Sequence, residues 1–171
     1  TPFDDTAVDF LETLDCPAYK IASFENTDTP LIRKVARTGK PIIVSTGMAT
    51  LADIDHAVTT IRAEGNDQII LLHCILSYPT PDEEMNLRRI PRLQREFPDL
   101  VMGLSCHNVP DPCVTVPTAS VALGAKVVEK HFTLDTSRPG EDHYLSVDPP
   151  LLRRMVENIR IPRGAGEVSG H

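Results

Sequence analysis

Short apolar runs alternate with helix-length segments along the whole chain. The runs cover residues 18–23, 42–45, 69–75, 100–105 and 126–131. Their starts lie about 24 to 31 residues apart, which leaves room for one crossover helix after each strand. Nearly continuous Val, Ile and Leu is typical of strands in a parallel sheet whose two faces are covered. The pattern therefore predicts an α/β protein with about five parallel strands.

The intervening segments carry helix signals. Thr50-Leu-Ala-Asp53 resembles a capping box, and apolar residues follow it at helical spacing, at Leu51, Ile54, Val58 and Ile61. Asp148-Pro149 offers an N-cap and a proline in the first helical position. Further helices are expected over 4–14, 29–38 and 86–97.

This order fits either an open doubly wound sheet or a (β/α)₈ TIM barrel. Five strands are too few to close a barrel, and the chain starts as if at the end of a missing strand. We expect an incomplete portion of a TIM barrel over residues 1–161. Residues 162–171, rich in glycine, are expected to form a linker or tail.

Composition restricts the function. The net charge of −7 argues against a nucleic-acid binder, which needs clustered Lys and Arg. No stretch approaches the length of apolar sequence that crosses a membrane. The four cysteines are scattered, which favours free thiols in a reducing compartment and hence a cytoplasmic protein.

Two histidines stand at equivalent places, just past the ends of neighbouring predicted strands. They are His107 in Gly-Leu-Ser-Cys-His and His131 in Val-Val-Glu-Lys-His-Phe. In a parallel barrel, residues at the carboxyl ends of strands converge on the active site. Two imidazoles there would suit a catalytic divalent metal. Taken singly, either histidine could instead bond a backbone carbonyl.

Other polar residues follow the strands. Lys20 lies inside an apolar run, where it could bind an anion, form a Schiff base or belong to a buried ion pair. Ser23, Ser45 and Ser105 could donate to phosphate or carboxylate oxygens, or be ordinary serines. Cys106 is a weak candidate ligand, because consecutive strand residues point to opposite faces.

The polar loop 138–143 is long enough to reach over the mouth of a barrel, and it could equally be a solvated surface loop. Asp142 and His143 are its candidate ligand contacts.

In this order, the motifs resemble the sialic acid synthase family, which includes N-acetylneuraminate, legionaminate, pseudaminate and spore-coat polysaccharide synthases. The matching text includes Tyr19-Lys-Ile-Ala-Ser-Phe-Glu25, Lys40-Pro-Ile-Ile-Val-Ser-Thr-Gly-Met48, Tyr78-Pro-Thr-Pro, Gly103-Leu-Ser-Cys-His107, Val127-Val-Glu-Lys-His-Phe132 and Pro139-Gly-Glu-Asp-His143. The resemblance places the chain at strands 4 to 8 of the family barrel.

The resemblance implies a transferase of carbohydrate and polysaccharide biosynthesis. It would condense phosphoenolpyruvate with an N-acyl-hexosamine, or its 6-phosphate, to a nine-carbon 2-keto sugar acid, with C–O cleavage and release of phosphate. It further implies a homodimer for the full-length protein. The implied roles are phosphoenolpyruvate binding by Thr1, Lys20, Ser23, Ser45 and Ser105, sugar contact by Tyr78 and Asp142, Mn²⁺ or Mg²⁺ ligation by His107 and His131, and proton transfer by Glu25.

Three departures from the family pattern bear on activity, one of them the loop 108–113, which lacks the usual Thr/Glu-x-Gly pattern. Members usually show Ser-Asp-His where this chain has Ser105-Cys106-His107, and a polar pair where it has Ile75-Leu76. We expect the 171-residue chain alone to be inactive. The alternatives are a Schiff-base aldolase acting through Lys20 and a truncated, non-catalytic paralogue.

Overall fold

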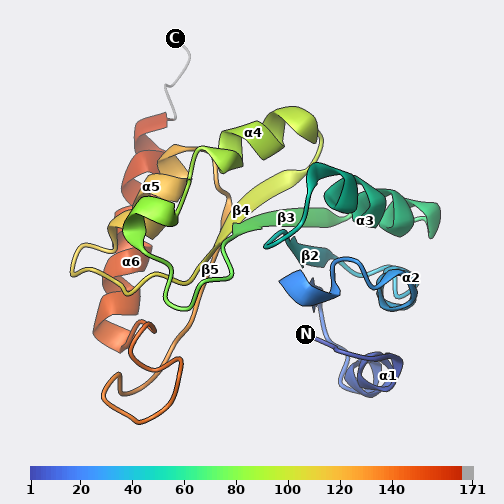
Figure 1. Cartoon of the computed structure of the whole chain (residues 1–171), viewed down its shortest axis with the longest axis horizontal. Coiled ribbons are helices and arrows are strands. Elements are labelled where there is room, and N and C mark those ends of the chain that lie inside the picture. The colour runs from blue at the N-terminus through green and yellow to red at the C-terminus, as the bar shows by residue number, and fades with distance from the viewer. Residues whose placement is uncertain (167–171) are drawn as a thin grey trace. The chain divides into compact units, whose positions relative to one another are not determined.

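The computed structural model describes residues 1–166, with side chains described through residue 161. The chain divides into two compact units, Thr1–Cys74 and Ile75–His171. Strands alternate with helices in each of them (Figure 1). Every strand pairing within a unit is parallel, so the predicted α/β class with parallel strands is confirmed.

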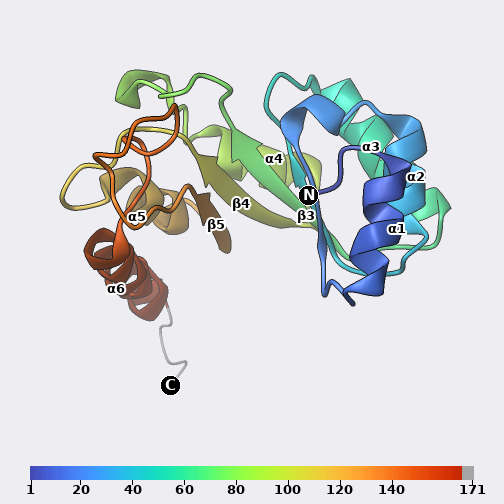
Figure 2. The same ribbon diagram turned by 90° about the horizontal axis from the view of Figure 1, so that it is seen from below.

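The first unit holds three neighbouring strands, in the order β1-β2-β3. Its elements are α1 (Asp5–Thr13), β1 (Tyr19–Ile21), the 3₁₀ turn η1 (Ser23–Glu25), α2 (Thr29–Ala36), β2 (Ile42–Ser45), α3 (Leu51–Ala63) and β3 (Ile69–Cys74). Helices α1, α2 and α3 follow one another along one side of these strands (Figure 2).

Helix α3 forms as its sequence predicts. Thr50 and Asp53 make a complete capping box, each accepting a hydrogen bond from the other's backbone N–H. Ile54, Val58 and Ile61 are buried, whereas Leu51 is only half-buried. The cap satisfies orphan amides of the first turn, and the apolar stripe anchors the helix to the unit.

Strand β1 is shorter than the predicted run because the chain turns into η1 at Ser23. Tyr19 and Ile21 are fully buried on one face, and the Tyr19 hydroxyl donates to Glu12 of α1 over 2.6 Å. Lys20 is half-buried on the other face, in register with Ile43 of β2.

The second unit holds the parallel pair β4 and β5. Its elements are the 3₁₀ turn η2 (Asp82–Glu84), α4 (Arg89–Glu96), β4 (Val101–Cys106), α5 (Thr115–Ala122), β5 (Val127–Lys130) and α6 (Pro149–Gly166). Helices α5 and α6 pack side by side (Figure 1). Val114, Val147 and Met155 form a core beneath them.

Helices α4 and α5 differ from expectation, whereas the start of α6 is as predicted. Helix α4 begins only after Asn86, whose positive φ of 42° interrupts a helix at that point. The sequence of α5 shows no distinct periodicity of apolar residues, so this helix was not predicted. Val114, the residue before it, has backbone angles in the left-handed region. The Asp148 cap of α6 is present, with the Leu151 amide donating to its carboxylate over 2.9 Å.

Helix α6 continues to Gly166, so residues 162–166 are helical where a linker was expected. Extending an existing helix adds a backbone hydrogen bond with each residue, which offsets the weak helix propensity of the glycines there. The remainder of the expected tail, 167–171, lies outside the described residues. No helix within the described part of the chain is long and apolar enough to span a membrane.

Candidate functional site

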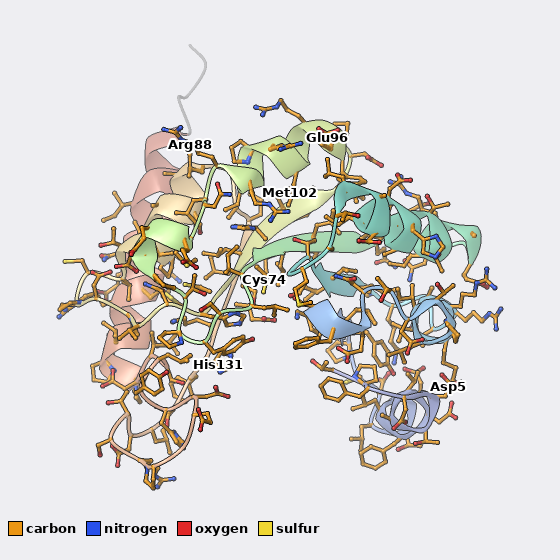
Figure 3. All side chains as sticks on the ribbon, viewed as in Figure 1. Asp5, Cys74, Arg88, Glu96, Met102 and His131 are labelled. Atoms are coloured by element: carbon orange, nitrogen blue, oxygen red, sulfur yellow. The ribbon has the colours of Figure 1, made fainter. Side chains whose placement is uncertain are left out.

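The two imidazoles singled out in the sequence meet in the second unit. Cys106 and Lys130 are paired at the ends of β4 and β5, so the next residues, His107 and His131, leave the two strands side by side. Figure 3 labels His131 just beyond β5. The ring centroids lie 5.4 Å apart, with the rings nearly edge-on at 74°.

His107 is held in one tautomer. It is 4% exposed, and its Nδ1 lies 2.8 Å from the carbonyl oxygen of Ile75. A carbonyl only accepts, so Nδ1 carries the proton and Nε2 presents its lone pair. Burial lowers the pKa of His107, and the nearby His131 adds to this, while the bond to Ile75 opposes it. The ring is therefore neutral near pH 7, the form that binds metals.

Tyr78 contacts both imidazoles. Its ring stacks on His107 at 3.9 Å and meets His131 edge-on at 5.7 Å. Its hydroxyl lies 2.8 Å from Nε2 of His107 and donates to that lone pair. On the outer side, Asp142 places a carboxylate oxygen 3.6 Å from Nδ1 of His131. Four of the residues implied by the resemblance thus lie together.

Glu129 belongs to this cluster and was missed in the sequence. Ser105 donates to its carboxylate over 2.6 Å. Ser105 and Glu129 are in register across β4 and β5, each two residues before a histidine. Residues two apart in a strand share a face. The repeated spacing Ser-x-His and Glu-x-His was the signal that could have revealed Glu129.

Cys106 lies between Ser105 and His107, and its partner Lys130 lies between Glu129 and His131. Both side chains therefore point to the other face of the strands. The Cys106 thiol donates to the side-chain oxygen of Asn108 over 2.8 Å. Lys130 donates to the carbonyls of Cys106 and Asn108. Burial lowers the pKa of Lys130, while the Cys106 thiol and Asp82 raise it. Neither side chain is placed to ligate an ion held by His107.

The length of metal–nitrogen bonds limits how far apart two imidazoles that bind the same divalent ion can lie. Metal–nitrogen bonds of about 2.1 Å put the centroids of two bound rings at most roughly 6.4 Å apart, and the observed 5.4 Å satisfies this. Among the described residues, no group of three or more His, Cys, Asp or Glu side chains is arranged to hold a metal. The spacing of the two rings alone is compatible with an ion that takes His107 and His131 as its two protein ligands.

The first unit gathers the other predicted residues after β1 and β2. The Gly47 amide donates to the Ser23 hydroxyl over 3.1 Å, and that hydroxyl lies 3.5 Å from the Cys74 sulfur. Ser45 is 2% exposed, and its Oγ has no hydrogen-bond partner among the described residues. Oε2 of Glu25 is also a buried atom without a hydrogen-bond partner among the described residues.

Buried polar atoms without partners are uncommon in native proteins, and a bound ligand is one of the things that satisfies them. Thr1 is exposed at the start of the chain, and Lys20 is half-buried in β1.

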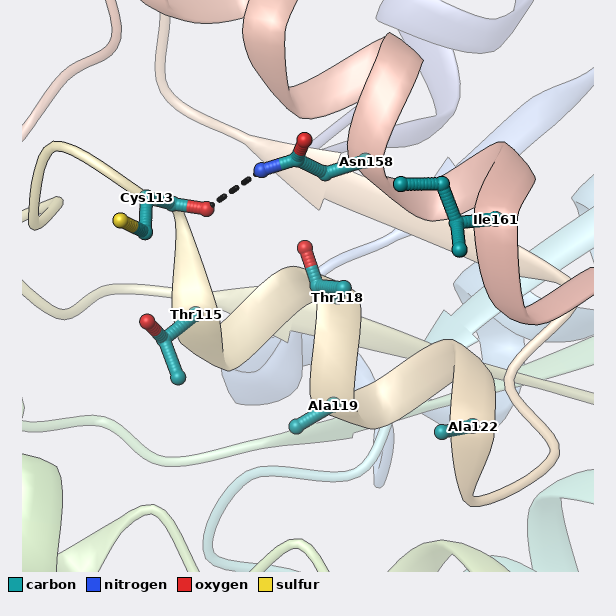
Figure 4. A pocket seen from close by; sticks show the side chains of 7 residues that line it. All are labelled: Cys113, Thr115, Thr118, Ala119, Ala122, Asn158 and Ile161. Atoms are coloured by element: carbon teal, nitrogen blue, oxygen red, sulfur yellow. Dashed lines mark hydrogen bonds between the residues drawn. The ribbon is translucent and has the colours of Figure 1, made fainter.

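A separate cavity of about 490 Å³ lies between α5 and α6 (Figure 4). It is mostly apolar, and the Asn158 amide closes one side by donating to the Cys113 carbonyl over 2.8 Å. None of the predicted site residues lines it.

Parallel strands that alternate with helices, with polar side chains gathered beyond the strand ends, define the α/β class of protein. A model of the NeuB family matches residues 1–167. The chain belongs to the NeuB family.

The similar proteins are sugar acid synthases and a spore-coat protein. The crystal structure of spore coat polysaccharide biosynthesis protein SpsE from Bacillus subtilis matches with a TM-score of 0.91 and 43% identity, over 95% of this chain and 45% of that one. N-acetylneuraminic acid synthetase from Leptospira borgpetersenii, in complex with citrate, matches with a TM-score of 0.90 and 30% identity, over 99% of this chain and 58% of that one.

N,N'-diacetyllegionaminic acid synthase from Legionella pneumophila is 40% identical over 94% of this chain and 45% of its own length. The chain spans about half the length of the curated relatives it matches. These likenesses confirm the expected fold class: the five parallel strands of the described residues, with their helices, are a portion of a (β/α)₈ TIM barrel.

Proposed function

We propose that this chain carries part of the active site of a synthase that condenses phosphoenolpyruvate with an N-acyl-hexosamine, or its 6-phosphate. The product is a nine-carbon 2-keto sugar acid, and phosphate leaves with C–O cleavage. The observation that supports this is the convergence of His107 and His131 at the ends of β4 and β5, in a member of a family with sugar acid synthases among its relatives.

A divalent ion, Mn²⁺ or Mg²⁺, would be held by His107 and His131, with open positions left for water and substrate oxygens. When bound, the ion polarises the aldehyde of the open-chain sugar toward attack by C3 of phosphoenolpyruvate. The chain's own part is to keep His107 neutral with Nε2 available. Burial keeps the ring neutral, and the bond from Nδ1 to the Ile75 carbonyl fixes the tautomer in which Nε2 carries the lone pair.

Sugar contact is assigned to Tyr78 and Asp142. Tyr78 is 46% exposed with its hydroxyl beside His107, so it can donate to a substrate oxygen near the ion. Asp142 lies on an exposed loop beside His131 and can accept from sugar hydroxyls.

Phosphoenolpyruvate binding is assigned, as the resemblance implies, to Thr1, Lys20, Ser23, Ser45 and Ser105. The buried Ser45 hydroxyl without a protein partner supports this, because an anion oxygen would satisfy it. Glu25 has a buried carboxylate oxygen in the same state. It would remove the proton of the water that adds to C2 after the carbon–carbon bond has formed.

The metal assignment is tested by calorimetric titration of Mn²⁺ into the chain and into two histidine variants. His131→Ala should lose the high-affinity site. His56→Ala is the matched control: His56 belongs to the first unit and is exposed on α3, where its ring contacts the Thr29 hydroxyl at 3.0 Å. Equal Mn²⁺ binding by His131→Ala and the wild type would remove the proposal.

The non-catalytic alternative has one supporting observation, the departures at Ile75-Leu76 and Cys106. It predicts that phosphoenolpyruvate does not bind even when Mn²⁺ does. Titrating phosphoenolpyruvate in the presence of saturating Mn²⁺ separates the two functions, with no need for turnover by this length of chain. A cytoplasmic location and a homodimer of the whole protein remain part of the proposal.

A further inference from the structure

The backbone around His107 leaves the sheet while it is still buried. Strand β4 ends at Cys106 and β5 ends at its partner Lys130, so the parallel ladder stops there. Cys106, His107 and Asn108 are nevertheless 0%, 4% and 1% exposed. Buried carbonyls beyond the end of a ladder need other hydrogen-bond donors, because an unpaired one costs free energy.

Donors from outside β4 meet all three of these carbonyls. Lys130 Nζ donates to the carbonyl of Cys106 over 3.3 Å and also to that of Asn108. The carbonyl between them, that of His107, accepts from the Thr80 amide over 3.0 Å. One ammonium thus spans the residues on either side of the histidine.

We propose that Lys130 is a positioning residue, whose ammonium fixes the 106–108 backbone and thereby aims the imidazole of His107 at its ligand. The group formed by Lys130 Nζ with the carbonyls of Cys106 and Asn108 is called the carbonyl clamp below. Its role in ligand binding depends on the proposed metal site, but the clamp itself does not.

Neighbouring contacts make the clamp specific. The Asn108 side-chain amide donates to Asp82 over 3.0 Å, and its oxygen accepts from the Cys106 thiol over 2.8 Å. These two hydrogen bonds fix the Asn108 side chain, and they thereby restrict the orientation of its main-chain carbonyl, which accepts from Lys130. Asp82 also brings a negative charge close to the buried ammonium, which lowers the cost of burying it.

The geometry separates the clamp from the site itself. Lys130 precedes His131 directly, so the two side chains leave β5 on opposite faces. The hydrogen bonds of Lys130 go to the backbone of the neighbouring strand end, and its charge reaches His107 only at a distance, where it adds slightly to the lowering of the His107 pKa. Its loss should misplace His107 without removing any ligand.

The clamp can be observed in the metal-free wild type by NMR of lysine side chains. We expect the Lys130 ammonium protons to exchange slowly with water and to show couplings across hydrogen bonds to the carbonyl carbons of Cys106 and Asn108. Lys126, exposed just before β5, is the internal control and should exchange rapidly. Equally rapid exchange at Lys130 would overturn the proposal, and this measurement needs no variant.

The positioning role is tested with Lys130→Met against Lys126→Met, which removes the same charge on the approach to the same strand. Once circular dichroism shows both variants folded, we expect Lys130→Met alone to lose the protected Nδ1 proton of His107. Its Kd for Mn²⁺ should rise about tenfold or more, the usual effect of losing support behind a ligand. Lys130→Arg, which can also donate to two carbonyls, should recover part of the loss.

A folded Lys130→Met with wild-type His107 signals and wild-type Mn²⁺ affinity would refute the positioning role. If Lys130→Met does not fold, the wild-type exchange measurement decides. Should Mn²⁺ fail to bind even the wild type while Lys130→Met still loses the His107 signal, the metal site would be wrong and the clamp would stand.

Discussion

The Tyr78 hydroxyl donates to Nε2 of His107 over 2.8 Å, on the nitrogen that a metal would occupy. The phenol therefore competes with an ion for the same lone pair. A hydrogen bond of this kind contributes about 0.5–1.5 kcal/mol net.

Tyr78→Phe should consequently bind Mn²⁺ about two- to tenfold more tightly than the wild type. The ring that stacks on His107 is retained, so folding should be unaffected. Calorimetric titration measures the change. Weaker Mn²⁺ binding by Tyr78→Phe would show that the phenol supports the ion instead of competing with it.

Glu129→Gln should keep the hydrogen bond from Ser105 and lose only the negative charge beside the histidines. We expect the Kd for Mn²⁺ to rise about tenfold, with stability within about 1 kcal/mol of the wild type. Ser105→Ala removes the bond and keeps the charge, so it is the complementary control. An unchanged Kd in Glu129→Gln would limit Glu129 to holding Ser105.

Ser45→Ala removes a buried hydroxyl that has no partner among the described residues. Urea unfolding should show stability unchanged or raised by about 1 kcal/mol, because an unsatisfied group is lost. Phosphoenolpyruvate should bind about tenfold more weakly, since a hydrogen bond to a charged group is lost.

Ser120→Ala is the matched control for Ser45→Ala, because it removes a buried hydroxyl that does have a hydrogen-bond partner. The Ser120 hydroxyl is fully buried and donates to the Pro117 carbonyl over 2.7 Å. Its loss should cost about 1 kcal/mol and leave phosphoenolpyruvate binding unchanged. Destabilisation of Ser45→Ala as large as that of Ser120→Ala would mean that Ser45 has a structural partner.

The start of α5 should be sensitive to acid through Asp111. Burial alone raises the pKa of Asp111, but hydrogen bonds from the Thr115 and Cys113 amides outweigh it and lower the pKa of this carboxyl. A lowered carboxyl pKa stabilises the fold above the unfolded-state pKa of about 3.9, and this stabilisation is lost as pH falls through the folded-state value.

The protection factors of the Thr115 and Cys113 amides, which correct for the intrinsic pH dependence of exchange, should therefore fall below about pH 3.9, before those of amides in the α5 interior. Asp111→Asn retains an acceptor but does not titrate, so its stability difference from the wild type should shrink as pH falls. A difference that stays constant from pH 6 to pH 3 would contradict this.

Sequence reasoning located the strands because their apolar runs are compact and bounded, and it located His107 and His131 because each follows such a run. Both imidazoles were placed by the register of β4 and β5, which requires only that neighbouring strands end together. Glu129 was not predicted, because the criterion that selects polar residues just beyond strand ends does not select a residue inside β5.

Helix α5 gave no clear periodic signal, because Thr115–Ala122 has apolar and small residues on every side. The start of α5 is stabilised by the Asp111 side chain, whose carboxylate accepts hydrogen bonds from the Cys113 and Thr115 amides. The clamp at Lys130 could not have been inferred either, since its acceptors are main-chain carbonyls that no sequence pattern reports.

The partner of His107 at Nδ1 is the main-chain oxygen of Ile75, and every amino acid supplies that oxygen. A substitution of the Ile75 side chain therefore leaves this acceptor in place. The tautomer of His107 is fixed by the course of the main chain, whichever side chain stands at this position.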